Sequence, residues 1–238
     1  MKIIRILLSN DDGNLAIGSQ LLIHLLKDKY ELIVAGPVDQ RSSIGAAVTT
    51  KGFEWEKVQK ENVMYYNVKG TPNDAIELVY TQEQPFDLMI SGINWGPNLS
   101  SYLYRSGTYN AVTCAVGFGL TEKGISLSWD LPAWTWHVDE NNQTANDYLI
   151  TPGQMVANFI DVILNNDLWG AQILNVNFPG NNTTEFQFSK LTLNQQDAYD
   201  RSYKPTSNFF DMGDRMVDSS GDNTDVAVLS RETHFKTQ

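Results

Sequence analysis

The chain has 238 residues, of which 42% are hydrophobic and 19% are charged, and its formal net charge is −11 at pH 7. This length and balance fit one large α/β domain with a substantial core and exclude wholesale disorder. The acidic balance argues against a nucleic-acid polymer as the partner, because that affinity depends on Lys and Arg neutralising phosphates.

Cysteine content and hydropathy bear on the compartment in which the protein is expected. Cys114 is the only cysteine, which excludes an intrachain disulfide and a cysteine-rich zinc site. No apolar run is long enough to span a bilayer, and Met1–Arg5 lacks the pattern of a signal peptide. We therefore expect a cytoplasmic protein with no membrane partner.

Strand and helix signals alternate along the first 180 residues. Apolar or β-branched runs predict strands at residues 3–9, 30–35, 46–56, 63–68, 86–91, 125–129 and 171–176. Helical spacing and capping signals predict helices at 15–29, from Thr71 onward, at 107–118 and at 152–165. Repeated β–loop–α units of this kind predict a three-layer α/β sandwich with a mostly parallel sheet.

The remainder of the chain has a different character. Residues 181–238 are polar and rich in Asn, Asp and Ser, with a last short strand predicted at 225–230. We interpret residues 1–180 as the core of one domain and residues 181–238 as a β-rich C-terminal arm of the same domain.

Two adjacent carboxylates, Asp11 and Asp12, follow the first predicted strand directly. Like charges held that close oppose each other's ionisation unless a cation or a shared proton intervenes. A hard divalent cation prefers carboxylate and neutral oxygen ligands. The segment Ser9–Gly13 is therefore the first candidate for chemistry.

Two further loops that follow predicted strands are rich in small oxygen-bearing residues, namely Asp39–Ser43 and Ser91–Asn98. Adjacent parallel strands bring their carboxyl ends together, so the three loops can form one pocket with all-oxygen ligands for Mg²⁺, Mn²⁺ or Ca²⁺. For each loop alone, ordinary turn chemistry is the better explanation of the composition. The coincidence of three loops favours a site.

A turn at Ser106-Gly107-Thr108 precedes the third predicted helix. Such a turn can hold a phosphate through backbone N–H groups and the helix dipole, although an ordinary helix cap has the same composition. Trp129, Trp134 and Trp136 could stack on a nucleobase or form a partly buried cluster.

Five motifs, taken together and in order, resemble those of one known family. They are Ile6–Gly13 (ILLSNDDG), Val34–Pro37 with Arg41-Ser42, Gly70–Asp74 (GTPND), Ser91–Asn98 (SGINWGPN) and Ser106–Thr108 (SGT). Over roughly the first 130 residues the chain resembles the SurE family of survival-protein 5′/3′-nucleotidases and acid phosphatases. Thr224–Val228 is a weaker match to a late motif of that family.

The resemblance implies that residues 1–180 are a Rossmann-like catalytic core that hydrolyses phosphomonoesters, mainly nucleoside monophosphates. It also implies assembly as a dimer or tetramer, with residues 181–238 contributing to the subunit interface. It implies one divalent ion per subunit, Mg²⁺ or Mn²⁺ (or Ca²⁺ in crystals), held by Asp11, Asp12, Ser42 and Asn94. We take Asp11 and Asp12 as the catalytic pair, with Asp11 the preferred group for orienting or deprotonating the attacking water.

The resemblance also implies the residues that bind the substrate phosphate, which are Asn98, Ser106, Gly107 and Thr108. Three departures from the family pattern bear on substrate preference and assembly. The family's Gly-x-His-Ala-Pro-Gly is Gly13–Gly18 (GNLAIG) here, Gly36 is inserted before Pro37, and the chain stops soon after Phe235.

Two other hypotheses stay open at this point. One is a SurE-like binding protein with weakened catalysis, which the altered loop at residues 14–17 favours. The other is a signalling receiver module, which also carries paired acids after its first strand. A receiver requires a phospho-accepting Asp at the end of its third core strand, whereas Asp87 precedes that strand here and Ser91 occupies the acceptor position.

Overall fold

The computed structural model describes residues 3–130, 143–166, 169–180, 187–189, 191, 204–205 and 210–211. The strand predicted at 225–230 and the tryptophans Trp134 and Trp136 lie outside the described residues, as does most of the predicted arm. Within the described part of the chain, no helix is both long enough and apolar enough to cross a membrane.

A seven-stranded sheet forms the middle of the molecule, with strand order β3-β4-β2-β1-β5-β6-β7. Its strands are β1 (Arg5–Ser9), β2 (Glu31–Pro37), β3 (Trp55–Lys60), β4 (Val63–Val68), β5 (Leu88–Trp95), β6 (Gly124–Trp129) and β7 (Ile173–Phe178). Every neighbouring pair is parallel except β3 with β4, which confirms the predicted mostly parallel sheet. A separate antiparallel pair joins β8 (Lys204–Pro205) to β9 (Phe210–Asp211).

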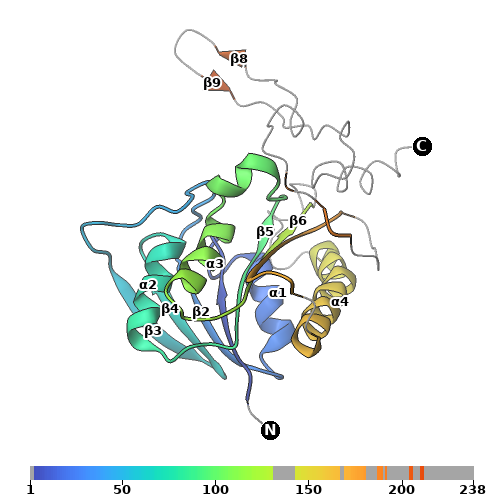
Figure 1. The fold of residues 1–238 in the computed structure, drawn as a ribbon, viewed down its shortest axis with the longest axis horizontal. Coiled ribbons are helices and arrows are strands. Elements are labelled where there is room, and N and C mark those ends of the chain that lie inside the picture. The colour runs from blue at the N-terminus through green and yellow to red at the C-terminus, as the bar shows by residue number, and fades with distance from the viewer. Residues whose placement is uncertain are drawn as a thin grey trace.

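Helices cover both faces of the sheet, so the predicted three-layer sandwich is confirmed. They are α1 (Ile17–Leu26), α2 (Pro72–Gln82), the 3₁₀ helix η1 (Ser100–Arg105), α3 (Gly107–Gly117) and α4 (Gln143–Asn165). Figure 1 shows α1 and α4 on one face and α2 and α3 on the other. Each face carries its own apolar core, one including Ile6 and Leu8 and the other including Leu7.

The start of α2 agrees with the sequence prediction. Thr71 accepts a hydrogen bond from the backbone N–H of Asp74, and Asp74 accepts one from the backbone N–H of Thr71. Pro72 occupies the first turn, where its missing N–H costs nothing. Local signals therefore suffice to place this helix.

The first strand of the predicted hairpin was placed wrongly. The sequence signal favoured residues 46–56, but the strand that pairs with β4 is β3 at Trp55–Lys60. All six residues of β3 are exposed, because it is the edge strand of the sheet. An edge strand needs no buried face, so its sequence lacks the alternation that identifies a strand.

Two other elements are longer than expected. Strand β5 continues through Gly92 to Trp95, with a shift of register between Ser91 and Asn94, where a loop was predicted. Helix α4 begins at Gln143, although Thr151-Pro152 has the composition of a helix start.

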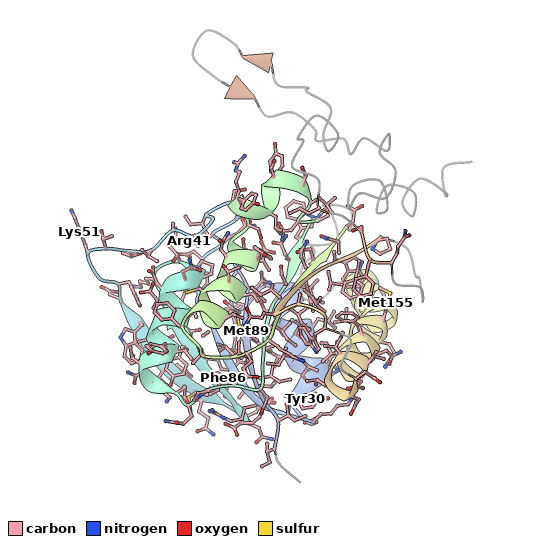
Figure 2. The ribbon with its side chains drawn as sticks, in the orientation of Figure 1. Tyr30, Arg41, Lys51, Phe86, Met89 and Met155 are labelled. Carbon is pink, nitrogen blue, oxygen red and sulfur yellow. The ribbon has the colours of Figure 1, made fainter. Side chains whose placement is uncertain are left out.

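The strand order brings the three predicted loops to one edge of the sheet. Strand β1 lies between β2 and β5, so the loops that follow these three strands are neighbours. In Figure 2, Arg41 marks this carboxyl edge, whereas Tyr30 and Phe86, which precede β2 and β5, lie at the opposite edge. The arrangement agrees with the rule that ligands of open parallel sheets bind at the carboxyl ends of strands.

Candidate active site

Asp11 lies just past the end of β1, and only 2% of it is exposed. Thr108, in the first turn of α3, donates a hydrogen bond of 2.6 Å from its hydroxyl to Asp11 Oδ1. Burial, with repulsion from Asp12 as the second cause, raises the pKa of Asp11 to about 7, and the hydrogen bonds from Thr108 oppose this rise only in part. This buried environment therefore favours a proton or a cation beside the Asp11 carboxylate.

Asp12 is the point at which all three loops meet. Its Oδ1 atom accepts hydrogen bonds from the Ser42 hydroxyl and from the Gln40 side chain, each at 3.2 Å. Its Oδ2 atom accepts one of 3.0 Å from the backbone N–H of Trp95. The predicted convergence of the loops after β1, β2 and β5 is therefore confirmed.

Asn94 is buried near the end of β5, directly before the residue that binds Asp12. Its side-chain NH₂ group donates to the backbone oxygens of Trp95 at 3.1 Å and Gly96 at 2.7 Å. These two bonds fix the orientation of the amide and use only its donors, so the amide oxygen stays available as a ligand.

The donor set at this edge fits a hard divalent cation. Within the described residues there is no group of three His, Cys, Asp or Glu side chains that could hold a metal. An ion bound by Asp11 and Asp12 would therefore need neutral oxygen ligands as well. Ser42 and Asn94 provide a hydroxyl and an amide oxygen, which belong to the oxygen ligands that Mg²⁺ and Mn²⁺ prefer.

Backbone contacts fix the shape of the acidic loop. The Asn10 side chain accepts a hydrogen bond from the backbone N–H of Asp12 at 3.1 Å and donates to the Ile93 backbone oxygen at 3.3 Å. The backbone N–H of Arg41 donates to the Asp11 backbone oxygen at 2.6 Å. Sequence reasoning did not assign a role to Asn10, although Asn at the start of a turn is a recognisable signal.

The predicted phosphate turn lies directly against the acidic pair. Ser106 caps α3 by accepting a hydrogen bond of 3.0 Å from the backbone N–H of Tyr109. A Cβ atom on Gly107 would lie 2.7 Å from Asp11 Cβ and 2.9 Å from Ile44 Cγ2, so only glycine allows the helix to approach this closely. In this structure Ser106 acts as a cap, while Gly107 and Thr108 contact Asp11.

Asn98 lies at the same edge, within a network from β6 and β7. Its side-chain NH₂ group donates to Ser128 Oγ at 2.8 Å, and its backbone N–H donates to Asn177 Oδ1 at 2.8 Å. Asn175 and Asn177 donate to its backbone oxygen. Its predicted role in phosphate binding stays a prediction. Ser128 and Asn177 were missed, although polar residues at strand ends are a usable signal.

Two of the competing interpretations can be compared with the structure. Asp87 accepts a hydrogen bond of 3.0 Å from the backbone N–H of Arg5, at the start of β1 and away from the acidic pair, which does not fit a receiver. Trp129 is 2% exposed and its indole N–H donates to the Pro179 backbone oxygen at 3.1 Å. Trp129 is therefore part of the core and does not face a ligand.

Comparison with known proteins gives one family. Residues 6–201 match the model of the family described as Survival protein SurE. A 5′-nucleotidase SurE of Thermoanaerobacter sp. (strain X514) is 34% identical over 180 residues, which cover 74% of this chain and 66% of that relative. The 5′-nucleotidase SurE of Kosmotoga olearia is 29% identical over 240 residues, covering 95% and 88% of the two chains.

The fold is also found in a solved structure. The crystal structure of the SurE protein from Aquifex aeolicus matches with a TM-score of 0.71 and 21% sequence identity. The match covers 96% of this chain and 90% of that chain.

Proposed function

This chain belongs to the SurE family, and we propose that it is a divalent-metal-dependent phosphomonoesterase that hydrolyses nucleoside monophosphates to nucleoside and phosphate. The observation that carries the proposal is the junction at Asp12, where residues from the loops after β2 and β5 bind a carboxylate next to the buried Asp11. The relatives named 5′-nucleotidase support the choice of substrate.

Asp11, Asp12, Ser42 and Asn94 would hold one Mg²⁺ or Mn²⁺ ion in this proposal. When bound, such an ion polarises phosphoryl oxygens and lowers the pKa of a coordinated water. The hydrogen bonds on Asp12 and Asn94 orient their oxygens before any ion arrives. A ligand set that is already oriented loses little conformational entropy on binding.

The two aspartates differ in what their oxygens already bind. Both oxygens of Asp12 accept hydrogen bonds, from Ser42 and Gln40 on one and from Trp95 on the other. On Asp11 the Thr108 hydroxyl binds Oδ1. We assign to Asp11 the task of orienting the attacking water and taking its proton, because its raised pKa suits a general base near neutral pH.

The first turn of α3 is the proposed phosphate site. A helix N-terminus carries backbone N–H groups and a positive dipole end, and here that end lies against the acidic pair. Asn98 would stabilise charge on the phosphoryl oxygens from the β6–β7 side. The same proposal includes activity on 3′-nucleotides and simple phosphomonoesters. It also includes assembly as a dimer or tetramer and a cytoplasmic location.

A SurE-like binding protein with weak catalysis is the second candidate. It is favoured by Leu15, which is 80% exposed at the position where the family pattern has histidine. Turnover separates the two candidates, because a binding protein would hold a nucleotide in the presence of Mn²⁺ without releasing phosphate.

The proposal is tested by phosphate release from 5′-AMP, 3′-AMP and p-nitrophenyl phosphate, with Mn²⁺ or with EDTA. We expect release that depends on metal and that falls about 100-fold or more in Asp12→Asn, because a neutral amide replaces a charged ligand and its NH₂ group cannot accept the hydrogen bond from Trp95. The matched control is Asp39→Asn, a carboxylate in the adjacent loop whose side chain is 73% exposed, and it should keep normal activity. Release that survives EDTA, or normal turnover by Asp12→Asn, would contradict the proposal.

A further inference from the structure

A row of buried polar side chains crosses the sheet one layer below the acidic pair. Ser9 on β1 is the register partner of Ser91 on β5, and Ser91 is the partner of Ser126 on β6. Ser126 is in turn the partner of Asn175 on β7. These four residues, which we call the polar row, therefore lie side by side on four adjacent strands.

The oxygens of the polar row lack protein partners. Ser9 Oγ, Ser91 Oγ, Ser126 Oγ and Asn175 Oδ1 are each buried without a hydrogen bond. Ser9 is 2% exposed, and Ser91 and Ser126 are 0% exposed. A buried polar group without a partner is costly, so four of them on one row indicate a ligand that the protein itself does not supply.

The polar row faces helix α3. Side chains alternate along a strand, and Ser9 and Ser91 continue the side of Leu7 and Met89, which belong to the core cluster with α3. The α3 residues buried in this cluster include Ala111 and Ala115, which have no polar side-chain atoms. The helix therefore offers these oxygens no side-chain partner from those two positions.

The spacing of the row suits water as the ligand. Neighbouring strands lie about 4.8 Å apart, and the oxygens of the polar row make no hydrogen bond to one another in this structure. A water that lies about 2.8 Å from each of two such oxygens fits this separation. We propose that the polar row binds a file of ordered waters, with bridging positions between Ser9 and Ser91, between Ser91 and Ser126, and between Ser126 and Asn175.

The file of waters would connect the region of Asp11 with the region of Asn98 through the interior of the protein. One end is at Ser9, two residues before Asp11, and the other is at Asn175, whose side-chain NH₂ group donates to the Asn98 backbone oxygen at 2.9 Å. The buried waters would form one continuous hydrogen-bonded chain between the strand that precedes Asp11 and the network around Asn98. This inference does not depend on the proposed enzymatic activity, because it concerns only buried groups of the folded chain.

The test is a crystal structure at high resolution together with thermal unfolding of Ser91→Ala and Ser126→Ala. We expect electron density for water within hydrogen-bond distance of both serine hydroxyls. Each variant should lower the midpoint of unfolding by roughly 2–4 °C, because a bound water loses a partner. If the hydroxyl had no water partner, the change to alanine would raise the midpoint, since removing an unpartnered buried hydroxyl relieves the cost of its burial.

The control is Ser19→Ala, because the Ser19 hydroxyl is buried and donates to the Gly13 backbone oxygen at 2.7 Å. The change in the unfolding midpoint of Ser19→Ala shows the effect of removing a buried hydroxyl that has a known partner. Lowered midpoints together with water density support the proposal. A midpoint that stays the same or rises in Ser91→Ala or Ser126→Ala, or a row without water density, overturns it.

Discussion

Replacing Asp11 by asparagine removes a negative charge that the metal-free protein buries at a cost. The pKa of Asp11 rises from 3.8 to about 7, chiefly through burial. Because the folded state holds this proton more tightly than the unfolded state, stability falls as pH rises through the range from about 4 to about 7 and then levels off. Asparagine does not ionise and escapes this loss, while its amide oxygen can still accept the hydrogen bond from Thr108.

The magnitude follows from the size of the pKa difference. Each pKa unit corresponds to about 1.4 kcal/mol, so the full penalty at high pH is about 4 kcal/mol. About half of it is already present at pH 5.5, because the unfolded Asp11 is ionised there. The advantage of Asp11→Asn over the native chain should therefore grow by about 2 kcal/mol between pH 5.5 and pH 8.5.

The assay is urea unfolding of both proteins in EDTA at several values of pH across that range. Asp12→Asn is the comparison, since Asp12 accepts hydrogen bonds from Ser42, Gln40 and Trp95, so its loss removes favourable contacts as well as a charge. A stability difference between Asp11→Asn and the native chain that does not change with pH would refute the reasoning. So would a variant that is less stable than the native chain at pH 8.5.

Three further predictions address packing, positioning and the metal. Gly18→Ala should destabilise the protein by about 2–4 kcal/mol in urea unfolding, because its Cβ would lie 1.9 Å from the Ile93 backbone oxygen. Gly117→Ala, which meets nothing within 4 Å, should be neutral or stabilising, and equal effects of the two changes would contradict this account. Thr108→Val should lower turnover about 10- to 100-fold, and Thr108→Ser should restore it, because serine keeps the hydroxyl that donates to Asp11. Full activity of the valine variant would show that this hydrogen bond is unnecessary. Mn²⁺ at about 100 times its Kd should raise the free energy of unfolding of the native chain by about 2.7 kcal/mol, and that of Asp11→Asn by much less. Thermal melts with and without Mn²⁺ measure this, and equal shifts in both proteins would place the ion elsewhere.

The sequence predicted the candidate site better than the boundaries of several elements. The positions of Asp11 and Asp12 at the end of β1 could be predicted because an apolar run identifies a buried strand. Such a strand must end where charged residues begin. The contacts of Ser42 and Trp95 with Asp12 required only that β1 lie between β2 and β5.

Other features depended on tertiary structure. Strand β3 is polar and exposed, and its pairing with β4 defines it. The continuation of β5 past Gly92 depends on a register shift that no local pattern encodes. The partners of Asn98 come from β6 and β7, which lie far along the chain, so the network around it was not predicted.

The central place of β1 has a consequence for how the site can move. Its acidic loop is bonded on one side to residues after β2 and on the other to the end of β5, and all three strands belong to one continuous sheet. The groups that bind Asp12 are therefore attached to neighbouring strands of one sheet, which holds them in a fixed relation to one another. At the proposed metal site, heating or denaturant should abolish ion binding only together with global unfolding of the sheet, and hydrogen exchange of the β1 amides should report both events at once.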